Sequence, residues 1–238
     1  MRRGDGGSRG ALVAAVARTL PWRAVGAGAV VGLLVVALPR LVSGPPDAWL
    51  GLTLLRAAAL VFALGLAFLQ DDPARRLTTP VPTRRWVRTG LRVALVAPVA
   101  ALWWTAVLVL VPEQARPPVG AITLEAASTA ALALAAAAVA VRLTDEPEPG
   151  PSVASGVLTL ALLAPLLLPA RWDLFVPAED PHWEAAHVRW AVVLVAAAAV
   201  LMACGPEPLR RRVLRNRPQP GLALERGSPD SPGSQSSI

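Results

Sequence analysis

Few side chains in this sequence could carry acid–base, nucleophilic or metal chemistry. The histidines are His182 and His187, the one cysteine is Cys204, and all 23 basic residues are arginine, with no lysine. Without lysine a Walker phosphate loop cannot form, so any ATP-driven role needs a separate ATPase. Histidines five positions apart diverge on a helix, and a lone cysteine does not build a metal site. We therefore predict no catalytic residue, no metal and no cofactor: the chain is not itself an enzyme.

Two charges are more informative because they lie inside long apolar segments. Arg56 falls in residues 48–69 and Glu125 in residues 119–141. Charged residues are costly inside a bilayer and usually face a partner or a wet cavity. At a rise of about 1.5 Å per residue, the two positions lie at similar depth in their segments, so they could pair. Such a pair would be either a structural ion pair that fastens two helices or a polar position on a translocation path.

The segments that position these charges are those of an integral membrane protein. The chain of 238 residues is 54% hydrophobic and 16% charged, whereas soluble domains have about 25% charged residues. Spanning a bilayer takes about 20 mostly apolar residues. Six segments qualify: 24–42, 48–69, 91–111, 119–141, 152–170 and 188–204. The sequence thus predicts an all-α, polytopic membrane protein with about six transmembrane helices.

Arginine counts predict the orientation of these spans. With six spans, 18 arginines fall on the side of the two termini and four on the other side. Basic loops stay in the cytoplasm, so we expect cytoplasmic N- and C-termini and a multi-pass protein of the cell (inner or plasma) membrane. The arginines beside the spans account for the net charge of +7 and indicate contact with anionic lipid, not with nucleic acid.

Three parts follow along the chain. Residues 1–23 form a cytoplasmic and interfacial segment, in which residues 10–22 resemble a helix lying in the membrane interface. Residues 24–204 form the transmembrane domain, and residues 205–238 form a basic, largely disordered tail. We also expect one or two short interfacial helices within the aromatic-rich connection 171–187. The small-residue pattern from Gly28 to Gly32 is attributed to chance in so glycine- and alanine-rich a chain.

The loop at residues 70–92 is the most strongly charged connection. It holds six arginines, at positions 75, 76, 84, 85, 88 and 92. Pro80 and Pro82 disfavour helix before them, and Thr83 suits the N-cap of a helix that follows. From there Arg84, Arg88 and Arg92 recur at helical spacing on one face. That face could meet acidic groups of a partner or anionic headgroups, or the arginines could serve only to hold the loop inside.

The same loop resembles the cytoplasmic loop of type-2 ABC transporter permeases, the membrane subunits of bacterial exporters. The resemblance is carried by Asp71-Asp72, Leu77-Thr78, Thr79-Pro80-Val81, Arg84-Arg85 and Gly90. It implies a coupling helix that docks on an ABC ATP-binding subunit, and a second permease copy or homologous permease as a further partner. The residues that would dock are Thr79, Pro80, Val81, Arg84, Arg85 and Arg88.

Two functions remain open at this point. The first is the permease subunit of an ATP-driven ABC exporter, with the 70–92 loop as its docking site. The second is a non-transporting six-span accessory or scaffold protein, in which the loop is a topological anchor. A membrane enzyme is the weakest reading, because the spans lack a nucleophile with a base and metal ligands at helical spacing.

Overall fold

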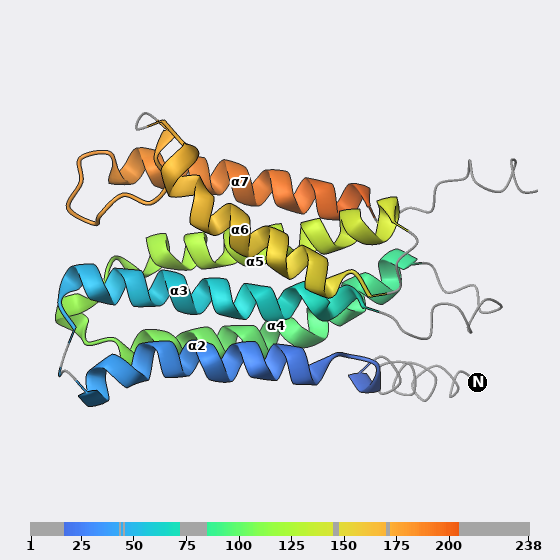
Figure 1. Ribbon diagram of the computed structural model, residues 1–238, viewed down its shortest axis with the longest axis horizontal. Coiled ribbons are helices and arrows are strands. Elements are labelled where there is room, and N and C mark those ends of the chain that lie inside the picture. The colour runs from blue at the N-terminus through green and yellow to red at the C-terminus, as the bar shows by residue number, and fades with distance from the viewer. Residues whose placement is uncertain are drawn as a thin grey trace, which may run out of the picture. The chain divides into compact units, whose positions relative to one another are not determined.

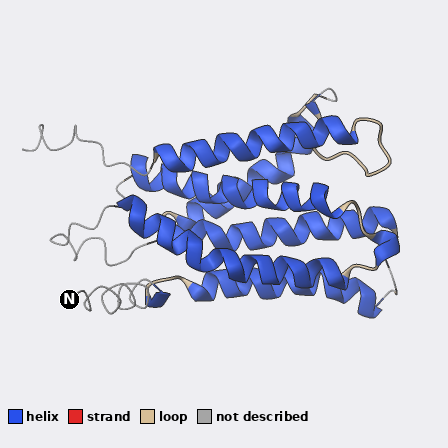
Figure 2. Cartoon of the chain, turned by 180° about the vertical axis from the view of Figure 1, so that it is seen from behind, coloured by secondary structure: helices blue, strands red, loops and turns tan. Residues whose placement is uncertain are grey.

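The computed structural model describes residues 17–42, 44, 46–71, 85–144, 148–169 and 172–204. In this part of the chain every regular element is helical (Figures 1 and 2). Six helices are long and apolar enough to cross a membrane. They are α2 (Trp22–Val42), α3 (Ala48–Ala67), α4 (Arg85–Leu110), α5 (Val119–Leu143), α6 (Gly150–Leu167) and α7 (Trp183–Ala203). The prediction of an all-α protein with six spans is confirmed.

Successive helices run in opposite directions, so the bundle has two ends (Figure 1). At one end α3, α5 and α7 begin; we call it the outer end, after the side that the arginine count predicts for it. At the other, the inner end, α2, α4 and α6 begin. Helix α3 lies in the middle and packs closely against α2 and α5, while α7 packs against α5. The most deeply buried helix therefore carries Arg56.

Glycines let α2 and α3 approach closely. A Cβ at Gly28 would lie 3.0 Å from the Val61 carbonyl oxygen, and a Cβ at Gly65 would lie 2.9 Å from the Ala24 carbonyl oxygen. Gly32 faces Trp103, whose ring would be only 2.6 Å from an added Cβ. Small residues allow this kind of backbone contact between helices in lipid. The attribution of the Gly28–Gly32 pattern to chance is thus wrong: both glycines pack inside the bundle.

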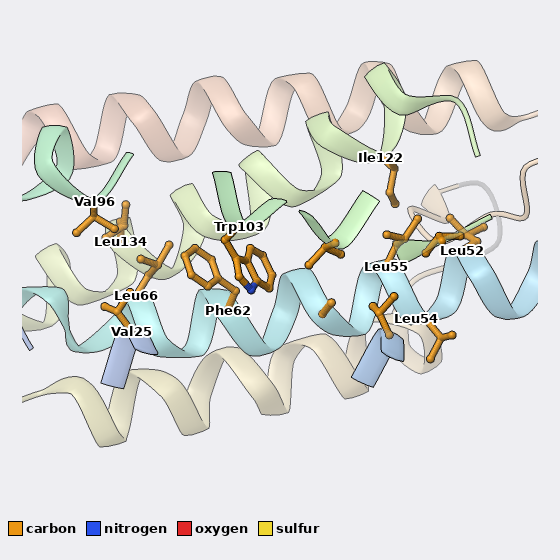
Figure 3. Packing of buried hydrophobic residues seen from close by; sticks show 14 of the residues in the cluster. Val25, Leu52, Leu54, Leu55, Phe62, Leu66, Val96, Trp103, Ile122 and Leu134 are labelled. Carbon is orange, nitrogen blue, oxygen red and sulfur yellow. The ribbon is translucent and has the colours of Figure 1, made fainter. Parts of the chain in front are cut away.

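Aromatic side chains fill the centre of the bundle. Phe62 of α3 stacks on Trp103 of α4, with ring centroids 4.2 Å apart (Figure 3). The indole Nε1 of Trp103 donates to the Ala29 carbonyl at 2.8 Å, which satisfies its polar atom away from water. Stacked pairs add about 0.5–1.5 kcal/mol beyond their buried area. Trp103 therefore joins α2, α3 and α4 at mid-bundle.

Two helices extend beyond the apolar spans that the sequence indicated. Helix α4 begins at Arg85, close to the helix start expected near Thr83, and continues into the span expected from residue 91. Helix α7 begins at Trp183 instead of residue 188. Before it, residues 173–182 form turns and irregular segments. Of the short interfacial helices expected in this connection, the described residues 172–182 show only a 3-10 turn at Trp172.

Candidate functional site

The polar centre of the described bundle is an ion pair between α3 and α5. Arg56 donates from Nε to Oε2 of Glu125 at 2.7 Å and from Nη2 to Oε1 at 2.8 Å. This two-pronged arrangement matches the planar guanidinium to the carboxylate and is the strongest form of the contact. The Glu125 side chain is 4% exposed and that of Arg56 17%. The structure brings together the two charges that the sequence placed at equal depth.

The outer connection completes the surroundings of Arg56. Its Nη2 also donates to the Val176 carbonyl at 3.1 Å, and its guanidinium carbon lies 5.7 Å from the Phe175 ring centroid. A cation over an aromatic face is stabilised electrostatically. Phe175 in turn packs edge-on against Trp190 of α7 at 5.6 Å. The connection before α7 therefore covers the ion pair from the outer end.

A third titratable group reaches the pair from α7. His187 places Nε2 at 3.2 Å from Oε1 of Glu125, and its side chain is 12% exposed. The direction of this contact is not that of a hydrogen bond. The other ring nitrogen, Nδ1, lies 2.7 Å from the Trp183 carbonyl oxygen one turn earlier. Three helices that all begin at the outer end thus contribute one charged or titratable group each.

His187 was expected in the connecting loop 171–187, and this expectation is wrong. Since α7 starts at Trp183, His187 lies on its second turn, about 6 Å along the helix axis. Pro181 just ahead of the helix and Glu184 in its first turn are start signals that would have predicted this boundary. The histidines do diverge: His182 is largely exposed and contacts Asp180 at 2.9 Å. Hydrogen bonds from His182 lower the pKa of Asp180.

Backbone carbonyls anchor α7 beside the cluster. The hydroxyl of Ser128 on α5, fully buried, donates to the Leu124 carbonyl in its own helix and lies 3.0 Å from the Trp190 carbonyl of α7. The indole of Trp190 donates to the Leu174 carbonyl at 3.0 Å. These contacts fix how α7 rotates against α5, and with it the position of His187.

A groove opens beside His187. It has a volume of about 520 Å³ and lies between the start of α5, at Pro118 and Ala121, and the first turns of α7. Trp183 and Glu184 line it together with the histidine ring. The walls are mainly apolar, and the polar groups are carried by α7. Of the three residues Arg56, Glu125 and His187, the lining of this groove includes His187.

The inner end holds a second polar cluster, built differently. Arg92 of α4 is 7% exposed and donates from Nη1 to the Leu69 carbonyl at 3.0 Å, with the Asp71 carbonyl at 3.5 Å. These carbonyls follow the end of α3, where a cation is favoured. The Arg92 side chain is therefore turned into the bundle. Its placement on an exposed face with Arg84 and Arg88 is wrong.

Asp71 extends this cluster to α6. Its Oδ1 accepts from the backbone N–H of Gly150, the first residue of α6, at 2.9 Å. Burial raises the pKa of the Asp71 carboxyl, an effect that the Gly150 hydrogen bond opposes. The start of α6 is thereby tied to the end of α3.

The predicted docking residues fall largely beyond what the structure describes. Thr79, Pro80, Val81 and Arg84 lie outside the described residues. Arg85 and Arg88 belong to the first turn of α4, but their side chains are not described. The N-terminal residues 1–16 and the tail beyond Cys204 are likewise outside.

The helices and their buried charges define a class, a multi-pass α-helical membrane protein. No family model, curated protein or solved structure matches the chain. Within the described ranges, no three His, Cys, Asp or Glu side chains gather as metal ligands would. The chemistry that the site offers is charge pairing.

Proposed function

We propose that this chain is the membrane-spanning permease subunit of an ATP-driven ABC exporter in the cell membrane. A separate ATP-binding subunit docks on the 70–92 loop, and a second permease copy or a homologous permease completes the transporter. The observation that carries the proposal is the way the ends of this loop are built into the bundle.

On one side of the loop, the chain leaves α3 through Leu69 and Asp71, whose carbonyls lie within reach of Arg92. On the other side, the loop enters α4, which continues without interruption from Arg85 to Leu110. A displacement of its first turn would be carried along α4 as far as Pro98, where one backbone hydrogen bond of the helix is missing. A partner that pushes on the loop would therefore move α4, and through Asp71 it would also move the start of α6.

The alternative, a non-transporting accessory or scaffold protein, is favoured by a different observation. The Arg56–Glu125 pair is satisfied within the bundle by two hydrogen bonds and covered by the outer connection, as expected of a fastener between helices. Under this function the arginines of the loop hold it on the cytoplasmic side. The two functions differ in whether an ATPase binds.

The first prediction separates the two functions by charge reversal. We expect an ABC ATP-binding subunit to co-purify with the tagged full-length protein in mild detergent and to be lost from the Arg84→Glu, Arg88→Glu variant. The two introduced glutamates would repel acidic groups of the partner, and this repulsion would make the complex dissociate during purification. Mass spectrometry of the co-purified proteins gives the readout.

The matched control is Arg210→Glu, Arg211→Glu in the tail, which changes the net charge equally on the same predicted side. It should retain the ATPase. If no ATPase accompanies the parent protein, or if all three forms retain it equally, the docking role of the loop is wrong.

A further inference from the structure

We propose that His187, which lines the groove at the outer end, is a proton-binding site. Protonated His187 pairs with Glu125, which already pairs with Arg56, so the three residues connect α3, α5 and α7. This inference does not depend on the transport function. It rests on what each nitrogen of the His187 ring faces.

The hydrogen bond at Nδ1 determines the neutral tautomer. The Trp183 carbonyl, 2.7 Å from Nδ1, can only accept, so this nitrogen must carry a proton. In the neutral ring Nε2 is then unprotonated, and Oε1 of Glu125 lies 3.2 Å from it. This oxygen lies off the direction along which Nε2 would form a hydrogen bond.

A proton on Nε2 turns the same contact into an attractive one. The imidazolium would donate to Oε1 of Glu125 and keep its bond to the Trp183 carbonyl. The Trp183 ring, with its centroid 4.3 Å from that of His187, lies within the range at which a cation is stabilised by an aromatic ring. Binding one proton, together with a turn of the ring that aligns Nε2 with Oε1, therefore satisfies both ring nitrogens without moving a helix.

Neighbouring charged groups favour or oppose the binding of a proton by His187. Arg56 of α3 competes for the same carboxylate, since its Nη2 is 2.8 Å from Oε1, and it repels a second cation. Glu184, on α7 itself, lines the groove by which a proton arrives. Glu125 of α5 is the group shared by both cations.

The test is nitrogen NMR of the full-length protein in detergent, with only its histidines labelled by ¹⁵N. The chain has just two histidines, and a His182→Gln variant assigns the signals. At pH 8.5 we expect His187 as the Nδ1–H tautomer. At pH 5.5 we expect both of its nitrogens to be protonated, with an Nε2 proton protected from exchange.

A pair of acid substitutions tests the partner. Glu125→Gln should abolish the protection of the Nε2 proton, whereas Glu184→Gln, in the same groove, should preserve it. The proposal is overturned by an Nε2–H tautomer at pH 8.5, by a His187 that stays neutral at pH 5.5 while His182 is charged, or by protection that survives Glu125→Gln. The tautomer is measured on the parent protein, so the test holds even if a variant does not fold.

Discussion

The two ends of the bundle each join three segments through a charged arginine, but by opposite means. At the outer end Arg56 meets another charge, Glu125, with His187 beside it. At the inner end Arg92 donates to backbone carbonyls that follow α3, and Asp71, on which Arg92 also acts electrostatically, accepts from a backbone N–H. Removing Glu125 at the outer end takes from Arg56 the carboxylate that holds it by two hydrogen bonds, whereas removing Arg92 at the inner end takes a donor from backbone carbonyls. Substituting one residue of the ion pair at the outer end should therefore lower the stability of the protein strongly, whereas one substitution at the inner end should lower it less.

The largest effect is expected from breaking the outer pair one residue at a time. Glu125→Leu leaves Arg56 with only the Val176 carbonyl and the Phe175 ring, and arginine cannot give up its charge. A buried charge without its partner costs about 3–5 kcal/mol. Arg56→Leu should cost less, because the remaining carboxylate can take up a proton or pair with a protonated His187.

The double variant Arg56→Leu, Glu125→Leu is the decisive comparison. With both charges gone, the site becomes an apolar contact, so protein yield and the midpoint of thermal unfolding in detergent should recover toward the parent. If the double variant is no better than the worse single one, the pair is not a unit and the contrast between the two ends disappears.

A smaller effect is expected at the inner end. Arg92→Leu leaves the carbonyls of Leu69 and Asp71 without this donor, and Leu69 is buried. Losing a hydrogen bond from a charged group costs about 1.5–3 kcal/mol. Thermal unfolding of the purified protein should show this loss, with part of it restored in Arg92→Lys.

The control for this prediction is Arg142→Leu, also at the inner end. Arg142 donates to the Ala203 carbonyl in an exposed position, where water can replace it, so the change should be well below that of Arg92→Leu. An Arg142 effect as large as that of Arg92 would show that burial of the acceptor is not what matters.

The contrast also explains what the sequence could reveal. Six apolar segments predicted the spans, and two charges at similar depth indicated that Arg56 and Glu125 could pair, because the bilayer limits both length and position. His187 was missed because the start of α7 was placed five residues late, and a shift of that size moves a side chain from a loop to a helix face.

Arg92 was misjudged for a different reason. Its partners are backbone carbonyls, and a carbonyl has no residue type by which a sequence can point to it. Helical spacing grouped Arg92 with Arg84 and Arg88, but spacing alone does not say which face meets the end of α3. Contacts between side chains of opposite charge can be predicted from sequence, whereas contacts to the backbone need the fold.

The smallest effect is expected at Asp71, where charge and hydrogen bonding can be separated. Asp71→Ala removes the acceptor for the Gly150 N–H and should cost about 1 kcal/mol, as for other caps at helix starts. Asp71→Asn keeps an oxygen at this place and removes the buried charge, so its stability should stay close to that of the parent at pH 7.

Because burial raises the pKa of Asp71 in the fold above its ordinary value of 3.8, the folded protein binds this proton more tightly than the unfolded chain. Stability of the parent relative to Asp71→Asn should therefore rise as the pH falls from 7 toward 4.5. The measurement is the midpoint of thermal unfolding of both proteins at the two pH values. If the parent instead loses stability relative to Asp71→Asn on acidification, the negative charge of Asp71 is stabilised by a partner, as that of Glu125 is. The two ends of the bundle would then be stabilised in the same way.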